Sequence, residues 1–259
     1  SKDILSLDVW PKKMVIVGAG VIGCEMATIF NQLGSEIVLV EYQDEILPPL
    51  DQDIKKRARN LYKRQGIDIY TKAAFKSVVE KDGKYVAIVE QKGKLLEFET
   101  DYVLLSTGRN PNFGNLNLDE LGIEYDRFGI KVDENKETNL KNIYAIGDVN
   151  GELMLAHKAT YDGYKVISAI LGEKMDIHFN QVPSVVFTFP EIATVGMIES
   201  ELTGTEYRSN KFLFKTNAKA ECLNETDGFV KMLVDENDIL VGCHIIGAHA
   251  SDLIHEATA

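Results

Sequence analysis

The chain has 259 residues, 45% of them hydrophobic and 26% charged, which is enough apolar material for one or two buried cores. A formal net charge of −12 repels phosphate backbones and anionic surfaces, so we expect neither nucleic acid nor a membrane as a partner. The three cysteines lie far apart, and no C-x-x-C or Cys/His cluster occurs, which indicates a cytoplasmic protein without a metal site.

The first part of the chain alternates between short apolar runs and helical patterns. The predicted buried strands are residues 14–17, 36–41 and 67–70, and the predicted helices are residues 21–33 and 52–65. Gly34 and Gly66 follow the two helical patterns directly, as glycines commonly do at helix ends. This β-α-β-α-β order predicts a parallel sheet with right-handed crossovers.

The pattern then changes to short strands separated by turns. Asp-Gly and Lys-Gly pairs divide residues 77–80, 85–90 and 95–98, which predicts an antiparallel β-meander. Further strands are predicted at residues 102–105, 143–146, 184–189, 193–195, 212–215, 229–234 and 242–246, with helices at 157–171 and from 252 onward.

The stretch VIVGAGVIGCEMA places three glycines in a G-x-G-x-x-G pattern, at Gly18, Gly20 and Gly23. A predicted strand precedes this loop, a predicted helix follows it, and Glu41 ends the next strand. In that context the glycines allow a tight turn and a close approach of backbone amides to a pyrophosphate at the helix start. The sequence therefore predicts a dinucleotide site.

The acidic residue selects between the two nicotinamide dinucleotides. The Glu41 carboxylate can accept hydrogen bonds from both ribose hydroxyls, and it would repel a 2′-phosphate. Residues 42–47 add two acids and no base, whereas a site for NADP usually offers Arg or Lys there. We therefore expect NAD rather than NADP.

Other candidate residues have competing interpretations. Asp148 follows an apolar run and can bind a ligand hydroxyl or simply form a turn. Arg109 can pair with a carboxylate or cover its own loop. His255 and Glu256 suggest a dyad, but neighbours on a helix point about 100° apart, so a surface position is favoured. Cys24 is more consistent with a small buried residue than with a nucleophile.

Together, five motifs resemble the pyridine nucleotide–disulfide oxidoreductases, and within them the dihydrolipoamide dehydrogenase branch. The motifs are GAGVIGCEMA, VLVE, LLSTGRNPN, NIYAIGDVNG with MLAHKA, and VPSVVFTFPEIATVG. The resemblance implies a flavoenzyme that oxidises dihydrolipoamide and passes electrons through a cysteine pair and FAD to NAD. It also implies a homodimer that serves a lipoyl-bearing acyltransferase of a 2-oxo acid dehydrogenase or glycine cleavage system.

The resemblance assigns roles to individual residues of this chain. The implied NAD contacts are Gly18, Ala19, Gly20, Val21, Ile22, Gly23, Glu41, Ala73, Ser106, Thr107, Gly108 and Arg109. The implied FAD contacts are Asp148, Met154, Leu155, Ala156 and His157. Glu25 matches a glutamate near the flavin that pairs with a lysine from the family's first segment.

The same resemblance indicates which catalytic parts to expect outside this chain. There is one G-x-G-x-x-G loop, no C-x-x-x-x-C pair and no His-Pro-Thr motif with its glutamate, so we expect a fragment with no catalytic residue of its own. The expected order is a linker at 1–11, a Rossmann-like NAD domain at 12–112, a partial FAD domain at 113–180 and a truncated α+β dimerisation domain at 181–259. We expect this chain alone to bind NAD(H) without turning over dihydrolipoamide.

Two other interpretations remain open at this point. One is a related flavin-dependent enzyme, such as a soluble transhydrogenase, mercuric reductase or glutathione reductase. Glu41 without nearby bases disfavours those that use NADPH. The other is a stand-alone nucleotide-binding or redox-sensing module.

Overall fold

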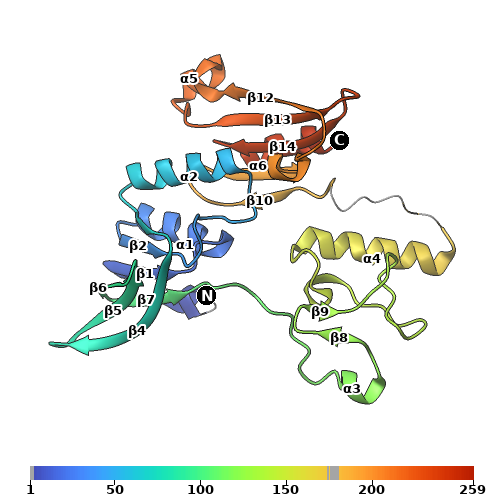
Figure 1. The fold of residues 1–259 in the computed structure, drawn as a ribbon, viewed down its shortest axis with the longest axis horizontal. Coiled ribbons are helices and arrows are strands. Elements are labelled where there is room, and N and C mark those ends of the chain that lie inside the picture. The colour runs from blue at the N-terminus through green and yellow to red at the C-terminus, as the bar shows by residue number, and fades with distance from the viewer. Residues whose placement is uncertain (1–2, 174, 176–180) are drawn as a thin grey trace. The chain divides into compact units, whose positions relative to one another are not determined.

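A computed structural model describes residues 3–173, 175 and 181–259. The chain divides into two compact units, one made of Ser1–Gly108 with Pro183–Ala259 and the other of Arg109–Val182 (Figure 1). Among the described helices, none has the length and apolar character needed to cross a bilayer.

The first unit contains a parallel sheet of four strands in the order β3-β2-β1-β7. Their bounds are β1 (Lys13–Val17), β2 (Glu36–Val40), β3 (Asp68–Tyr70) and β7 (Tyr102–Leu105). Side chains alternate between the faces of a strand, and both faces here are buried: Met14 and Ile16 join one core, Val15 and Val17 the other. The predicted parallel sheet is confirmed.

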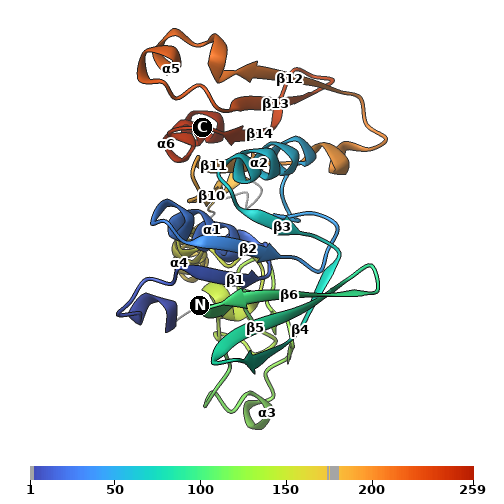
Figure 2. The ribbon, with the colours of Figure 1, turned by 90° about the vertical axis from the view of Figure 1, so that its left-hand side faces the viewer.

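Different elements cover the two faces of this sheet (Figure 2). Helices α1 (Val21–Gln32) and α2 (Gln52–Arg64) pack on one face, and the antiparallel meander covers the other. The meander strands are β4 (Ala73–Lys81), β5 (Lys84–Gln91) and β6 (Lys94–Thr100). Both hairpin turns have two residues of positive φ, Asp82-Gly83 and Lys92-Gly93, as the predicted tight turns require.

A second, antiparallel sheet belongs to the same unit and has the order β10-β11-β14-β13-β12. Its strands are β10 (Ser184–Val186), β11 (Ile192–Gly196), β12 (Tyr207–Leu213), β13 (Phe229–Asp235) and β14 (Leu240–Ile246). One face shares a core with α2, through Phe229 and Ile246, and α6 (Ala250–Thr258) covers the other. Shorter elements of this unit are η1 (Asp3–Ser6), η4 (Glu199–Leu202), η5 (Phe214–Thr216) and α5 (Ala218–Leu223).

The second unit has its own small core of Leu118, Ile123, Ile130 and Ala145. Its elements are α3 (Leu118–Leu121), β8 (Tyr125–Asp126), β9 (Gly129–Ile130), η2 (Gly147–Asn150) and α4 (Ala156–Leu171).

The predicted strand over residues 143–146 is wrong. Tyr144 makes an isolated bridge with Glu137, while Ile143 and Ile146 are 38% and 44% exposed. An apolar run becomes a strand only where a neighbouring strand pairs with it, and that partnership depends on tertiary context. The strand predicted at 212–215 also differs, because β12 begins at Tyr207 and gives way to η5 at Phe214.

Candidate functional site

The glycine loop lies where the carboxyl ends of β1, β2 and β7 meet. Gly18 has a φ of 98°, which favours glycine, and its amide donates to the Val40 carbonyl at 2.8 Å. The Ser106 hydroxyl, at the end of β7, lies 2.9 Å from both the Val17 and the Gly18 carbonyl oxygens. Hydrogen bonds thus join the turn after β1 to the ends of both neighbouring strands, β2 and β7.

Two glycines of the loop have different physical roles. A Cβ on Gly23 would lie 1.8 Å from the Gly18 carbonyl oxygen, so only glycine lets α1 pack this closely on the loop. A Cβ on Gly20 would meet nothing within 4 Å. Gly20 therefore leaves open space in front of the first amides of α1, whose N-cap offers no side-chain hydrogen bond.

Glu41 directly follows β2, and the residue is only 7% exposed. Oε2 accepts a hydrogen bond from the Ala19 amide and Oε1 one from the Gln43 amide, each at 2.7 Å. Each carboxylate oxygen accepts about two hydrogen bonds, so acceptor capacity remains for a ligand. The same carboxylate therefore orients the glycine loop and presents acceptors beside it.

A cavity of about 770 Å³ opens over this loop, within the size range of small-molecule sites. The predicted residues that line it are Gly18, Gly20, Val21, Ile22, Glu41, Ala73, Ser106, Thr107 and Gly108. Ala19 and Gly23 are buried and support the loop, whereas Arg109 is exposed and belongs to the second unit. Tyr42 and Gln43 also line it, from the segment in which the sequence shows no base. The sequence did not single out Pro48 or Phe75, because no motif marks them.

Cys24 and Glu25 lie directly behind the loop. Cys24 is fully buried, and burial followed by the charges of Glu41 and Glu25 raises the pKa of its thiol, which suits a packing residue. Glu25 accepts a hydrogen bond from the Phe187 amide at 2.9 Å. Burial raises the pKa of Glu25, and this amide opposes the shift.

In the second unit, the candidate FAD residues lie on two consecutive elements. Asp148 is exposed on the short η2 turn. Met154 and Leu155 are half-buried just before α4, and Ala156 and His157 are exposed in its first turn. The N-cap of α4, Leu155, makes no side-chain hydrogen bond to the first turn of this helix.

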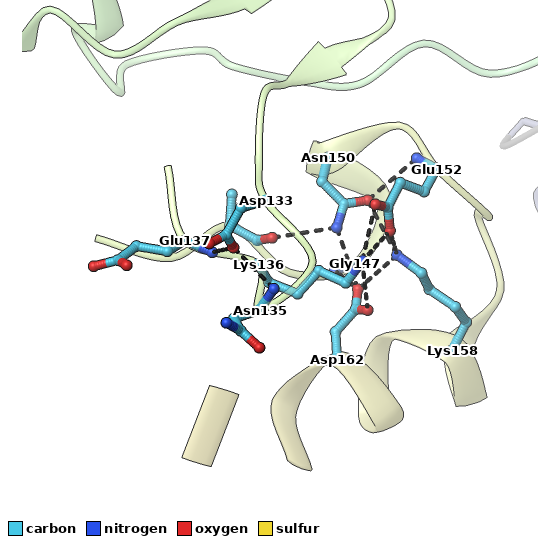
Figure 3. A network of polar contacts seen from close by, with 10 residues as sticks. Asp133, Asn135, Lys136, Glu137, Gly147, Asn150, Glu152, Lys158 and Asp162 are labelled. Carbon is cyan, nitrogen blue, oxygen red and sulfur yellow. Dashed lines mark hydrogen bonds and ion pairs between the residues drawn. The ribbon is translucent and has the colours of Figure 1, made fainter. Parts of the chain in front are cut away.

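A buried polar network fixes the η2 turn to α4 (Figure 3). Lys158 has a side chain 1% exposed and lies 2.7 Å from both Asp162 and Glu152. Asp162 Oδ2 also accepts a hydrogen bond from the Gly147 amide at 3.0 Å, at the start of η2. Burial would raise the pKa of Glu152, but Lys136 and Lys158 hold it below its ordinary value. One feature of the sequence marks this network, the i, i+4 spacing of Lys158 and Asp162.

Replacing Asp162 by asparagine is expected to destabilise the second unit by about 2–4 kcal/mol, because Lys158 loses a buried charged partner. Hydrogen exchange at the Gly147 amide should accelerate, and urea unfolding should begin at a lower concentration. Asp148→Asn is the matched control, because Asp148 is exposed and no hydrogen bond joins its side chain to the network within the described residues. Equal effects of the two variants would contradict the bracing role of Asp162.

Matches to known proteins cover both parts of the chain. The family model of the pyridine nucleotide-disulphide oxidoreductases matches residues 1–163, and that of their dimerisation domain matches residues 182–259. The chain is 41% identical to dihydrolipoyl dehydrogenase of Bacillus subtilis over 261 residues, covering 99% of this chain and 56% of that protein. It is 40% identical to leghemoglobin reductase of Glycine max over 263 residues, covering 99% and 50%. The chain thus spans about half the length of the curated relatives it matches.

Solved structures agree with this relationship. LpdA from Mycobacterium tuberculosis superposes with a TM-score of 0.89 at 29% identity, over 98% of this chain and 56% of that one. The HOCl-induced flavoprotein disulfide reductase RclA from Escherichia coli gives a TM-score of 0.87 at 26% identity, over 98% and 59%. The predicted mixed α/β fold and family resemblance are confirmed: the chain belongs to the pyridine nucleotide-disulphide oxidoreductase family.

Proposed function

We propose that the cavity over the glycine loop binds NAD(H). Family membership implies the use of FAD and of NAD or NADP, and the observation that carries the choice of NAD is the position of Glu41. Its carboxylate lines the cavity at the end of β2, where it can accept hydrogen bonds from the adenosine ribose. The open space at Gly20 and the uncapped start of α1 suit a pyrophosphate.

The surroundings of Glu41 supply the selectivity against NADP. Tyr42 and Gln43 follow it along the cavity wall, and neither carries a positive charge. No Lys or Arg side chain occurs among the described residues that line this cavity. A 2′-phosphate here would face the Glu41 carboxylate without a compensating cation.

Exchanging both residues for arginine, in the variant Glu41→Arg/Gln43→Arg, tests the assignment. We expect NADH to bind at least about tenfold more weakly and NADPH more tightly, because the charge facing the 2′ position reverses. Fluorescence titration of both nucleotides gives their affinity ratio. Unchanged affinities for both nucleotides would place the nucleotide elsewhere. Equal weakening of both would instead indicate misfolding, which thermal unfolding of the variant detects.

We further propose that the whole protein is a dihydrolipoamide dehydrogenase that also binds FAD. When bound, FAD would supply the electron transfer between a dithiol and NAD. Asp148 would accept hydrogen bonds from hydroxyls of the FAD chain, on a turn held by the buried network. Met154, Leu155, Ala156 and His157, at the start of α4, would lie beside the flavin.

In this proposal, residues 12–112 form the NAD domain, 113–180 a part of the FAD domain and 181–259 a part of the dimerisation domain. Glu25 is the carboxylate beside the flavin. Burial raises its pKa, and a cationic partner at this position would stabilise its ionised form. The matching dimerisation-domain model supports a homodimer, and the relatives named dihydrolipoyl dehydrogenase support a lipoyl-bearing acyltransferase as partner. A cytoplasmic location is also part of the proposal.

A further inference from the structure

A second cavity lies where α2 meets the ends of β12 and β13, and it shares no residue with the nucleotide cavity. Its volume is about 320 Å³, at the lower end of the range for small-ligand sites. The residues that line it are Asp53, Lys56, Arg57, Asn60, Lys211, Leu213, Lys215, Thr226, Gly228 and Phe229.

The charge of this lining is opposite to that of the molecule. Four of the lining side chains are cationic and one is acidic, in a chain whose net charge is −12. The one acid, Asp53, is already shared by Lys211 and the buried Lys231, each at 2.7 Å. Among the described residues, Lys56 and Lys215 have no carboxylate within 4.0 Å, so their charges are available to a ligand.

The Arg57 guanidinium lines the same cavity. Its Nη2 forms an ion pair with Asp227 at 3.0 Å, and Asp227 forms a second ion pair with Arg64 at 2.6 Å. Arg57 Nε is enclosed and has no hydrogen-bond partner among the residues that the structure describes. An enclosed donor without an acceptor is unfavourable unless a ligand or water satisfies it.

We propose that this cavity is a binding site for a small molecule that carries a phosphate group. Phosphate oxygens are compact, multiply charged acceptors, and Arg with surrounding Lys is the donor set that recognises them. Asn60 and Thr226 supply further polar groups, while Leu213 and Phe229 form an apolar wall that suits the body of a metabolite. The site is independent of the proposed NAD site, because its residues come from other elements.

Titration of the 259-residue chain with inorganic pyrophosphate, followed by calorimetry, tests the proposal. The variant Lys56→Gln/Lys215→Gln should bind pyrophosphate at least about fivefold more weakly, because two charge-assisted contacts are lost. The variant Lys92→Gln/Lys94→Gln is the matched control, since it removes the same charge from the exposed β5–β6 turn. It should bind as the wild type does.

Amide chemical shifts locate the bound pyrophosphate. We expect changes at Asn60, Thr226 and Gly228, beyond any at the glycine loop. Changes confined to Gly18–Gly23 would overturn the proposal, and so would equal weakening in the two double variants, which indicates a general charge effect. Absence of binding at the cavity would overturn it as well. None of these results bears on the preference of the first cavity for NADH.

Discussion

Replacing Lys231 by methionine is expected to lower the free energy of unfolding by about 3–5 kcal/mol, measured by urea denaturation at pH 7. Lys231 is fully buried on β13, and its Nζ lies 2.7 Å from Asp53 and Glu199 and 2.9 Å from Asp51. Asp51 and Asp53 belong to the start of α2, so this one ammonium group joins helix α2 to the second sheet. Its loss leaves three carboxylates close together without their shared cation.

The matched control is Lys211→Met. Lys211 makes a comparable 2.7 Å ion pair with Asp53, but its side chain is 38% exposed. Water therefore screens this pair, and we expect its loss to cost less than about 1 kcal/mol. Equal costs for the two variants would contradict the argument that burial makes Lys231 important.

The contribution of Lys231 to the free energy of unfolding should also depend on pH. Burial would raise the pKa of Asp51 and of Asp53, but other contacts outweigh it and hold both pKa values below that of an ordinary aspartate. For Asp51 these contacts are Lys231 and backbone amides, and for Asp53 they are Lys211 and Lys231. A carboxyl group whose folded pKa is depressed stabilises the fold above its unfolded pKa, and this contribution is lost as pH falls through the folded pKa. The stability difference between wild type and Lys231→Met should therefore narrow below about pH 4. A constant difference from pH 7 to pH 3 would contradict this linkage.

Gly23→Ala is expected to destabilise the chain by about 3 kcal/mol or more and to abolish NADH binding. The added Cβ would lie 1.8 Å from the Gly18 carbonyl oxygen and 2.8 Å from Ser106 Oγ, so α1 must move away from the loop. Thermal unfolding and fluorescence titration with NADH measure the two effects. Wild-type stability in this variant would show that the helix has room to shift.

Gly20→Ala separates binding from folding. Gly20 has a φ of −73°, and its added Cβ would meet no protein atom within 4 Å, so stability should change by less than about 1 kcal/mol. The methyl group would occupy space that a pyrophosphate needs, so NADH binding should weaken substantially. Unchanged NADH affinity would indicate that the dinucleotide does not approach this part of the loop.

Local sequence patterns predicted most of the helices, strands and turns of the first unit. The apolar runs of β1 and β2, the glycines after α1 and α2, and the Asp-Gly and Lys-Gly turns each carry their own structural preference, and the structure agrees with them. The glycine loop and Glu41 could also be recognised in the sequence, because the dinucleotide motif is a contiguous pattern and its acidic residue follows at a nearly fixed distance along the chain. The run over residues 143–146 failed as a strand because, among the described residues, it pairs only through the isolated bridge between Tyr144 and Glu137.

The sequence by itself thus determined the family, most elements of the first unit and part of the lining of the first cavity, since short-range motifs encode them. Only the tertiary structure brought Lys231 to Asp51, 180 positions away, and assembled Lys56, Arg57 and Lys215 around a second cavity. A lysine in an amphipathic strand or helix looks the same in sequence whether it faces water or a buried carboxylate. Which of the two it meets depends on how helix α2 packs against the second sheet, and this long-range packing leaves no local pattern.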